Sequence, residues 1–330
     1  MAITAADYNN IRNKIVGVLG TGAGGYGQSI TSVAATSATV ISSTIWNGLR
    51  SDLIRARQHQ TGVDESANLP ILTRTTSITE AIRQQFDNYA NLCVNNKFKI
   101  GLVGSADTPS ATIDQGQNET FATSTTFTSN WNTVLHHKVV ATFSSALQAN
   151  YWFNAGGQFR FFAAKEVPPT PVLSKDIEWS NIIGNSTTKN GNTSSGFGKV
   201  FYNFGTIGTL ANTANVAGTA TPSLSFYNNS PTFNTINLPT TATTIFFRSF
   251  TGYGAVNRYN IDMYVNNATA PTAFTWLITF RDLAAGNVDE QNTGRLTSYV
   301  DILRPTVSGG VTLNAPALTV NTGLTTTAQT

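Results

Sequence analysis

The sequence predicts an α+β protein that is mainly β, with a small helical unit at the N-terminus followed by a β-sandwich or Greek-key region. The first observation is composition: only 11% of the 330 residues are charged, 40% are hydrophobic, and Thr, Asn and Gly fill many polar positions. Thr favours half-buried strands, whereas Asn and Gly favour turns. The second observation is a change of pattern near residue 97, from helical spacing of apolar residues to short apolar runs separated by turn residues.

The first predicted helix begins close to the N-terminus. Tyr8, Ile11 and Ile15 recur at the spacing of one helical face. Thr4 is a candidate N-cap because Asp7 follows three residues later, as in a capping box. We assign residues 1–97 to a small, mostly helical unit for docking or oligomerisation.

Two more helices are predicted in this unit, after an extended connection rich in Thr, Ser and Ala over residues 29–43. The second helix extends towards His59, with Thr44 as its candidate cap, and has three apolar residues at helical spacing: Ile45, Leu49 and Leu53. Ser77 and Glu80 form an S-x-x-E capping box for the third helix. Its apolar stripe contains four residues: Ile78, Ile82, Phe86 and Tyr89.

From Phe98 onward the sequence predicts short strands, which we assign to a sandwich domain over residues 98–304. The candidate strands are 98–103, 120–128, 133–143, 150–163, 199–205, 245–250, 258–265, 274–281 and 296–303. Residues 154–157, Asn-Ala-Gly-Gly, separate two aromatic runs and predict a β-hairpin turn. Residues 176–183 fit one short helix, and residues 206–243 fit long loops or short edge strands.

The last segment, residues 305–330, contains no charged residue. We expect an extended C-terminal arm. Two interpretations of it remain open: it pairs with a neighbouring chain, or it is a disordered end.

Several classes of protein are disfavoured by simple features of the sequence. No run of apolar residues is long enough to span a membrane, and the N-terminus lacks the apolar core of a signal peptide. The single cysteine, Cys93, excludes an internal disulfide framework, and it falls where the third helix should face the core. The net charge of +3 is too small to indicate a nucleic-acid partner.

A glycine-rich run after the first helix, Gly20 to Gly25, matches G-x-G-x-x-G. A dinucleotide site also needs a following helix and an acidic residue about 20 residues further on. The residues that follow are poor helix formers, and no Asp or Glu lies between Asp7 and Asp52. We therefore interpret the run as a glycine turn that closes the helix at Gly20 and expect no cofactor.

The histidines and carboxylates give no strong catalytic or metal pattern. His136 and His137 are neighbours on a predicted strand, so they point to opposite faces, and we expect one to be half-buried and the other exposed. A glycosidase would need a pair of carboxylates across a cleft. The candidates are scattered: Asp176, Glu178, Asp282, Asp289 and Glu290. We predict neither a metal site nor an enzyme.

Aromatic residues cluster in residues 151–153, 159–162 and 246–247. On a strand, Tyr151 and Phe153 would share one face and Trp152 would occupy the other. Burial from both sides, as in an oligomer, is the interpretation we favour. Stacking on sugars is the alternative, and exposure of Tyr227, Tyr253 or Trp276 would favour it.

Three blocks of the sequence resemble virion structural proteins of tailed phages, particularly cyanophages. They are residues 7–28, residues 46–53 with 59–62, and residues 150–161; a weaker block spans residues 278–305. The resemblance implies a component of the particle rather than an enzyme, with no catalytic residues. The lone cysteine suits assembly in a reducing host cytoplasm.

We therefore predict a virion protein that acts as a tail, neck or baseplate fibre or adaptor and assembles as a homo-oligomer, most simply a trimer, with other virion proteins. Nine residues are predicted to matter for assembly: Tyr8, Ile11, Ile15, Trp46, Leu49, Leu53, Asn154, Gly156 and Gly157. The alternatives are a module of a tail fibre that binds a host surface glycan, a depolymerase, and a capsid decoration protein.

Overall fold

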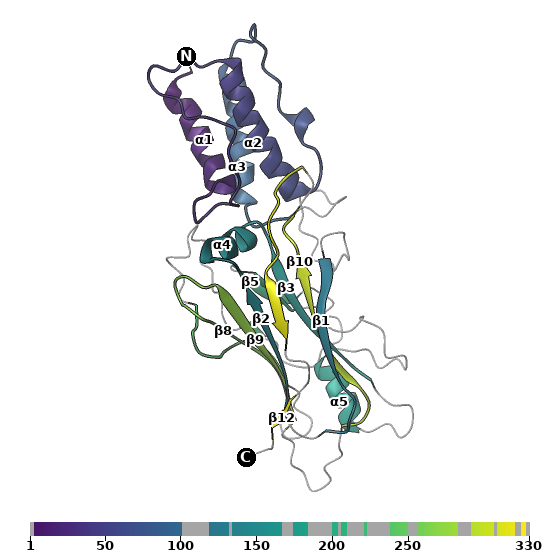
Figure 1. Ribbon diagram of the computed structural model, residues 1–330. Coiled ribbons are helices and arrows are strands. Elements are labelled where there is room, and N and C mark those ends of the chain that lie inside the picture. Colours follow the sequence, from purple (N-terminus) through teal and green to yellow (C-terminus); the bar gives the residue numbers. More distant parts are fainter. Residues whose placement is uncertain are drawn as a thin grey trace.

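A computed structural model gives the fold of the chain (Figure 1). The residues that the structure describes are 3–100, 119–131, 134–166, 174–183, 200–203, 206–209, 221–222, 238–249, 257–282, 292–306, 309–320 and 325–327. Helices at the N-terminus precede a β-rich region, so the predicted α+β, mainly β class is confirmed. In the described residues, none of the helices has the length and apolar character that a membrane crossing requires.

The helical unit contains three long helices that lie side by side (Figure 1). They are α1 (Ala5–Leu19), α2 (Ser43–Thr61) and α3 (Glu80–Asn95), with a short 3-10 helix, η1 (Ser66–Asn68), between the last two. Their core is built on aromatic contacts: the Trp46 ring centroid lies 5.7 Å from that of Tyr8 and 4.9 Å from that of Phe86. Cys93 is buried in the same core, as expected.

The predicted caps were correct for one helix and wrong for two. The Thr4 hydroxyl accepts a hydrogen bond from the Asp7 amide at 3.2 Å, and the Asp7 carboxylate accepts one from the Thr4 amide at 2.8 Å, which confirms the capping box. α2 is preceded by Ser42 rather than capped at Thr44. α3 is capped by Thr79 rather than Ser77, because Glu80 is already helical and binds Arg83 in the next turn.

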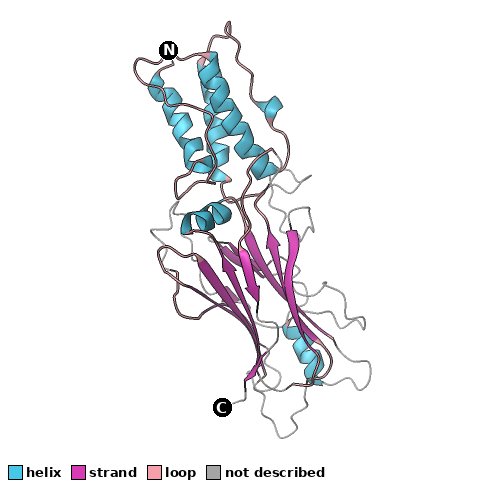
Figure 2. Cartoon of the chain, viewed as in Figure 1, coloured by secondary structure: helices cyan, strands magenta, loops and turns pink. Residues whose placement is uncertain are grey.

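The β-region consists of two antiparallel sheets that face each other (Figure 2). The first has the order β1-β10-β3-β4-β5, and the second the order β11-β2-β9-β8-β7-β6, with β12 also paired to β2. The strands are β1 (Glu119–Phe127), β2 (Val134–Thr142), β3 (Gln158–Lys165), β4 (Val200–Asn203), β5 (Thr206–Thr209), β6 (Thr221–Pro222), β7 (Thr243–Ser249), β8 (Arg258–Val265), β9 (Ala273–Arg281), β10 (Leu296–Leu303), β11 (Ala317–Val320) and β12 (Thr325–Thr327).

Most of the predicted strands are present, and those at 258–265 and 296–303 have the predicted bounds. The short helix is also confirmed as α5 (Ser174–Ile182). Residues 98–100 of the first candidate strand form a turn and coil, and residues 101–103 lie outside the described part of the chain. Within 206–243, the described strands are short and lie at sheet edges, as expected.

The predicted hairpin at residues 154–157 is wrong, because the residues before it form a helix, α4 (Ala146–Asn154). Ser145 caps this helix. The aromatic residues of the helix are buried on every side, so the sequence shows no alternation between an apolar and a polar helix face. Gly156 has a φ of 89°, and its amide binds the Phe153 carbonyl. The Gly157 amide binds the Trp152 carbonyl. The two glycines therefore form a Schellman cap of α4, not a hairpin turn.

The C-terminal segment pairs with its own chain. β11 and β12 both lie along β2, at residues 139–142 and 134–136 respectively. Residues 309–313, upstream of β11, contact the helical unit and bury Val311 in its core. The described part of the segment is thus built into the fold of its own chain, and the two interpretations left open, pairing with a neighbouring chain or a disordered end, do not describe these strands within one copy.

Aromatic contacts join the two sheets. The ring centroids of Phe159 on β3 and Trp276 on β9 are 4.4 Å apart, and both side chains are fully buried. His137 on β2 reaches across the same interior, with 2.9 Å between its Nδ1 and the Ser298 Oγ of β10. Since His136 is half-buried and His137 is fully buried, the two do face opposite sides, but the expectation that one is exposed was wrong.

His137 should make the fold sensitive to acid. Burial lowers the pKa of His137 to about 4, against 6.5 in the unfolded chain, so between these values the unfolded chain binds more protons. The part of the stability that depends on neutral His137 is therefore complete above about pH 6.5 and declines as the pH falls towards 4, by roughly 3 kcal/mol at 1.4 kcal/mol per unit. Urea unfolding between pH 4 and 7 measures this decline.

The matched variants are His137→Asn, which we expect to remove this part of the decline, and His136→Asn on the opposite face, which should leave most of it. Buried His59, whose pKa is also lowered to about 4, contributes a further decline in all three proteins. Equal acid sensitivity in the wild type and His137→Asn would contradict this account.

Candidate functional site at the junction

Residues from three separate parts of the sequence, 20–28, 57–61 and 151–157, meet between the helical unit and the sandwich, where α4 lies beneath the helices (Figure 1). We call this region the junction and define it as residues 20–28, 57–61, 151–157 and 309–313. Its contacts join residues that are about one hundred or more positions apart in the chain. The junction is therefore the place where the two parts of the molecule are fixed to each other.

Side chains of α4 bind the glycine-rich loop of the helical unit. The Asn154 amide nitrogen donates hydrogen bonds to the Ala23 carbonyl at 2.9 Å and the Gly25 carbonyl at 3.1 Å. The Tyr151 hydroxyl donates to the Thr21 carbonyl. Because Asn154 and Tyr151 are buried, these bonds satisfy carbonyl groups that would otherwise lose their hydration without replacement.

The loop can approach α4 only because of its glycines. Gly27 has a φ of 72°, and a Cβ there would lie 2.3 Å from Cδ2 of Tyr151. A Cβ on Gly25 would lie 1.9 Å from the Gly20 carbonyl oxygen, since the loop folds back on the end of α1. The G-x-G-x-x-G match is thus explained by packing, and Gly20 itself ends α1 with an extended backbone.

His59, near the end of α2, binds the turn after α4. Its Nε2 lies 2.8 Å from the Ala155 carbonyl oxygen, and because a carbonyl only accepts, Nε2 carries the proton. The Tyr26 ring packs against the imidazole with centroids 4.9 Å apart. Complete burial lowers the pKa of His59 to about 4, so the ring is neutral near pH 7.

A second layer of hydrogen bonds fixes Tyr26 and the end of α3. Gln60 donates to the Tyr26 hydroxyl at 3.1 Å and to the Cys93 carbonyl at 2.8 Å. The Tyr26 hydroxyl in turn donates to the Lys97 carbonyl. Burial raises the pKa of Cys93 to about 12, which keeps this thiol protonated and unreactive.

The C-terminal segment closes the junction from outside. Gly310 lies so close to α2 that a Cβ there would be 2.9 Å from the Cα of His59. The Gln28 side chain donates to the Thr312 carbonyl at 3.2 Å. The segment therefore crosses from β10 to the helical unit before it returns to the sandwich as β11.

A second polar cluster lies at the other end of the sandwich, around α5. Lys165 Nζ is 2.8 Å from the Asp176 carboxylate, and both side chains are fully buried. Lys175 Nζ is 3.0 Å from the Asp282 carboxylate, which is also fully buried. Desolvation raises the pKa of the buried Glu178 carboxyl.

These contacts bear on the carboxylates considered for glycoside hydrolysis. Asp176 and Asp282 are each bound to a lysine inside the protein instead of lining a cleft. Asp289 and Glu290 lie outside the described residues. No group of three potential metal ligands occurs within the described residues.

The predicted assembly residues lie in two places. The six on the helices are fully buried in the core of the helical unit: Tyr8, Ile11, Ile15, Trp46, Leu49 and Leu53. They would therefore act on assembly only through the fold of that unit. Asn154, Gly156 and Gly157 lie at the junction, where the first binds the loop and the glycines cap α4.

Three aromatic residues were named as the test for sugar binding, and the structure describes one of them. Trp276 is fully buried in the sandwich, so it does not meet the condition set for sugar binding. Tyr227 and Tyr253 lie outside the described residues. Sequence reasoning gave no role to Tyr26, His59, Lys165 or Asn292, because no local motif pairs them with the groups that they bind.

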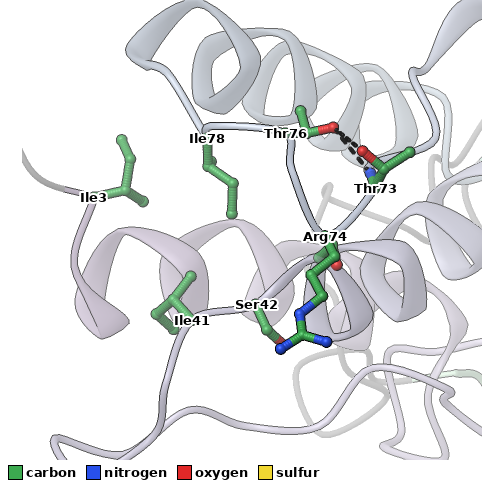
Figure 3. Close-up of a pocket in the computed structure, with 8 residues that line it drawn as sticks. Ile3, Ile41, Ser42, Thr73, Arg74, Thr76 and Ile78 are labelled. Atoms are coloured by element: carbon green, nitrogen blue, oxygen red, sulfur yellow. Dashed lines mark hydrogen bonds between the residues drawn. The ribbon is translucent and has the colours of Figure 1, made fainter.

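The end of the helical unit farthest from the sandwich has an open pocket of about 400 Å³ (Figure 3). It is lined by Ile3, Ile41, Ser42, Ser43, Thr73, Arg74, Thr76 and Ile78. Thr73 and Thr76 bind each other across a turn, with 2.8 Å between their hydroxyl oxygens. None of the predicted site residues lies in this pocket.

No family model, curated protein or solved structure matches this chain. Its function is therefore argued from its own residues and contacts.

Removal of the Asn154 amide should weaken the junction. Asn154→Ala leaves two carbonyls of the loop without their donor, and we expect a loss of about 1–3 kcal/mol of unfolding free energy. Asn10→Ala, at an exposed position of α1, is the matched control and should change stability by less than about 0.5 kcal/mol. Equal stabilities of the two variants in urea unfolding would refute the assigned role.

Gly27→Ala should destabilise the protein more than Gly22→Ala. The first places a side chain at positive φ and against the Tyr151 ring, whereas a Cβ on Gly22 meets nothing within 4 Å. Backbone strain of this kind costs about 1–3 kcal/mol before the clash is added. Thermal unfolding of the pair measures the difference, and a Gly27→Ala variant as stable as Gly22→Ala would argue against the close approach.

Proposed function

We propose that this chain is a structural subunit of a tailed-phage particle, a homo-oligomeric fibre or adaptor at the tail, neck or baseplate. The observation that carries the proposal is that the blocks resembling phage structural proteins meet at the junction. Thr21 from the first block, His59 from the second and Asn154 from the third all belong to it. A subunit that transmits force between two attachment points requires a rigid internal joint, and residues of all three blocks form one here.

The chemistry of the junction supports a mechanical role. Its side chains bind backbone carbonyls of the same chain, and most are buried. Such bonds fix the angle between the helical unit and the sandwich, and the side chains that form them are not accessible to a ligand. A rigid joint between a docking part and a projecting part suits a fibre or adaptor.

The charge of the protein supports assembly into many close copies. The net charge is +3, from 20 basic and 17 acidic residues, so copies repel one another only weakly. The exposed face of α3 is nearly free of charge after its first turn. It presents Ala81, Gln84, Gln85, Asn88, Asn91, Leu92 and Asn95.

This face, which we call the α3 face, runs along one side of the helix. Positions 81, 85, 88, 92 and 95 follow one another in steps of four and three residues, and Ala81 and Leu92 are the apolar members. Leu92 is 39% exposed, and polar residues within a helix–helix seam specify register and copy number. We propose that the α3 faces of neighbouring copies pack together, most simply around a three-fold axis.

The oligomer test introduces charge on the α3 face. The wild type should sediment as a trimer, whereas the double variant Asn88→Glu, Leu92→Glu should sediment as a monomer with an unchanged circular dichroism spectrum. Ala38→Glu, at an exposed loop position, is the control and should stay a trimer. A monomeric wild type at micromolar concentration would remove the homo-oligomer from the proposal.

The particle test is independent of the oligomer test. Peptides of this chain should be found by mass spectrometry in purified particles, and labelled antibodies should locate it at the tail, neck or baseplate by electron microscopy. Label on the capsid surface would favour a decoration subunit instead. Absence from purified particles would refute the virion role altogether.

A further inference from the structure

Three side chains near α5 form a chain of contacts inside the protein. Lys175 Nζ lies 3.0 Å from Oδ2 of Asp282, and the Asn292 amide nitrogen donates to the same oxygen at 2.6 Å. Asp282 and Asn292 are fully buried, and Lys175 is 6% exposed. One carboxylate oxygen therefore holds a primary amine and a carboxamide within two hydrogen-bond lengths of each other.

Asn292 is held rigidly in an apolar setting. Its backbone forms a β-bridge with Trp131, with N–O distances of 2.8 and 3.1 Å in the two directions. The Trp131 ring packs on Trp179 of α5 with centroids 4.9 Å apart. Among the described residues the Oδ1 of Asn292 has no hydrogen-bond partner, so this buried oxygen can accept a hydrogen bond that polarises the carbonyl group for attack.

We propose that Lys175 and Asn292 join in an intramolecular isopeptide bond, with Asp282 as the group that moves the proton. This inference does not depend on the proposed function. The bond would link α5 directly to the residues that precede β10. Both of these elements belong to the sandwich at the end away from the helical unit (Figure 1).

The step balances without any further reactant. Asp282 takes a proton from the Lys175 ammonium, and the neutral Nζ attacks Cγ of Asn292. The Cγ–Nδ2 bond then breaks, Nδ2 takes the second proton of the attacking nitrogen and leaves as ammonia, and a new Nζ–Cγ amide remains. An ammonium, a carboxylate and a carboxamide thus become an amide, a carboxylic acid and ammonia, with net charge zero on both sides.

Burial favours this reaction. An ion pair in an apolar interior has lost most of its hydration, so conversion to neutral groups recovers part of that cost. Glu178 is another buried carboxyl nearby; burial raises its pKa, with a smaller raising effect from Asp282 and a lowering effect from Lys175.

The neighbouring pair, Lys165 and Asp176, does not have the same arrangement. Lys165 Nζ binds the Asp176 carboxylate and the backbone carbonyls of Glu166 and Thr293, so all three protons of its ammonium have acceptors. Asp176 also accepts two hydrogen bonds from Thr293. These contacts stabilise the charged pair instead of preparing an amine for attack.

Intact-mass measurement of the full chain under denaturing, reducing conditions tests the proposal. We expect a mass below the sequence mass by one ammonia molecule, after allowance for the initiator methionine. Protease digestion should release one branched peptide that contains both Lys175 and Asn292. An unchanged mass, or conversion of Asn292 to aspartate without a branch, would overturn the proposal.

Variants identify which side chains form the bond and which one moves the proton. Asn292→Ala and Asp282→Ala should both restore the full sequence mass and abolish the branched peptide. Asn154→Ala, which removes a buried asparagine at the other end of the sandwich, should keep the loss of ammonia. Because the wild-type mass alone decides whether the bond exists, failure of a variant to fold does not protect the proposal.

Discussion

The arrangement of the molecule depends on one constraint: the backbone carbonyl groups of the glycine-rich loop must be hydrogen-bonded where they are buried. The loop must fold back on α1 to reach the sandwich, and only glycine permits that path at residues 25 and 27. Once folded, its carbonyls point towards α4 and are bound by Asn154 and Tyr151. The position of α4 then fixes the start of β3, because only the three residues of the Schellman cap, 155–157, lie between them. A local backbone requirement thereby sets how helices and sheets are joined.

The sandwich holds its shape by different means along its length. Its middle is filled by aromatic side chains from both sheets, such as Phe159 and Trp276. Its two ends are polar, with the junction at one and the buried lysine–carboxylate pairs at the other. Apolar burial supplies most of the stability, whereas hydrogen-bonded polar groups select one geometry, since a misplaced partner leaves a buried group unsatisfied. The ends are therefore where the relative positions of the elements are specified.

Local patterns predicted the elements whose signals are local. The capping box of Thr4 and Asp7 and the apolar alternation of β8 and β10 needed no distant partner. Residues 151–154 were assigned wrongly because a helix buried on all sides has no period, and a Gly-Gly pair marks a Schellman cap as well as a hairpin. The junction and the α5 cluster could not be predicted, because each contact joins residues that only the tertiary fold brings together. Two signals of the junction were visible in the sequence, and each was ambiguous. The glycine-rich run matched a nucleotide motif, and residues 154–157 resembled a hairpin turn.

Many of the few charged residues of this chain lie inside the protein. Of the 37 charged residues (20 basic plus 17 acidic), eleven are buried among the described residues alone: Asp52, Arg57, Glu65, Lys97, Arg160, Lys165, Lys175, Asp176, Glu178, Asp282 and Asp301. Asp52, for example, accepts the amides of Thr31 and Ser32 and fixes the connection between α1 and α2. A chain that places so many of its few charges inside uses them to specify its own fold. The other 26 charged residues are outnumbered in the sequence by Thr and Asn, whose hydroxyl and amide groups can meet copies of the protein without the cost of desolvating ions.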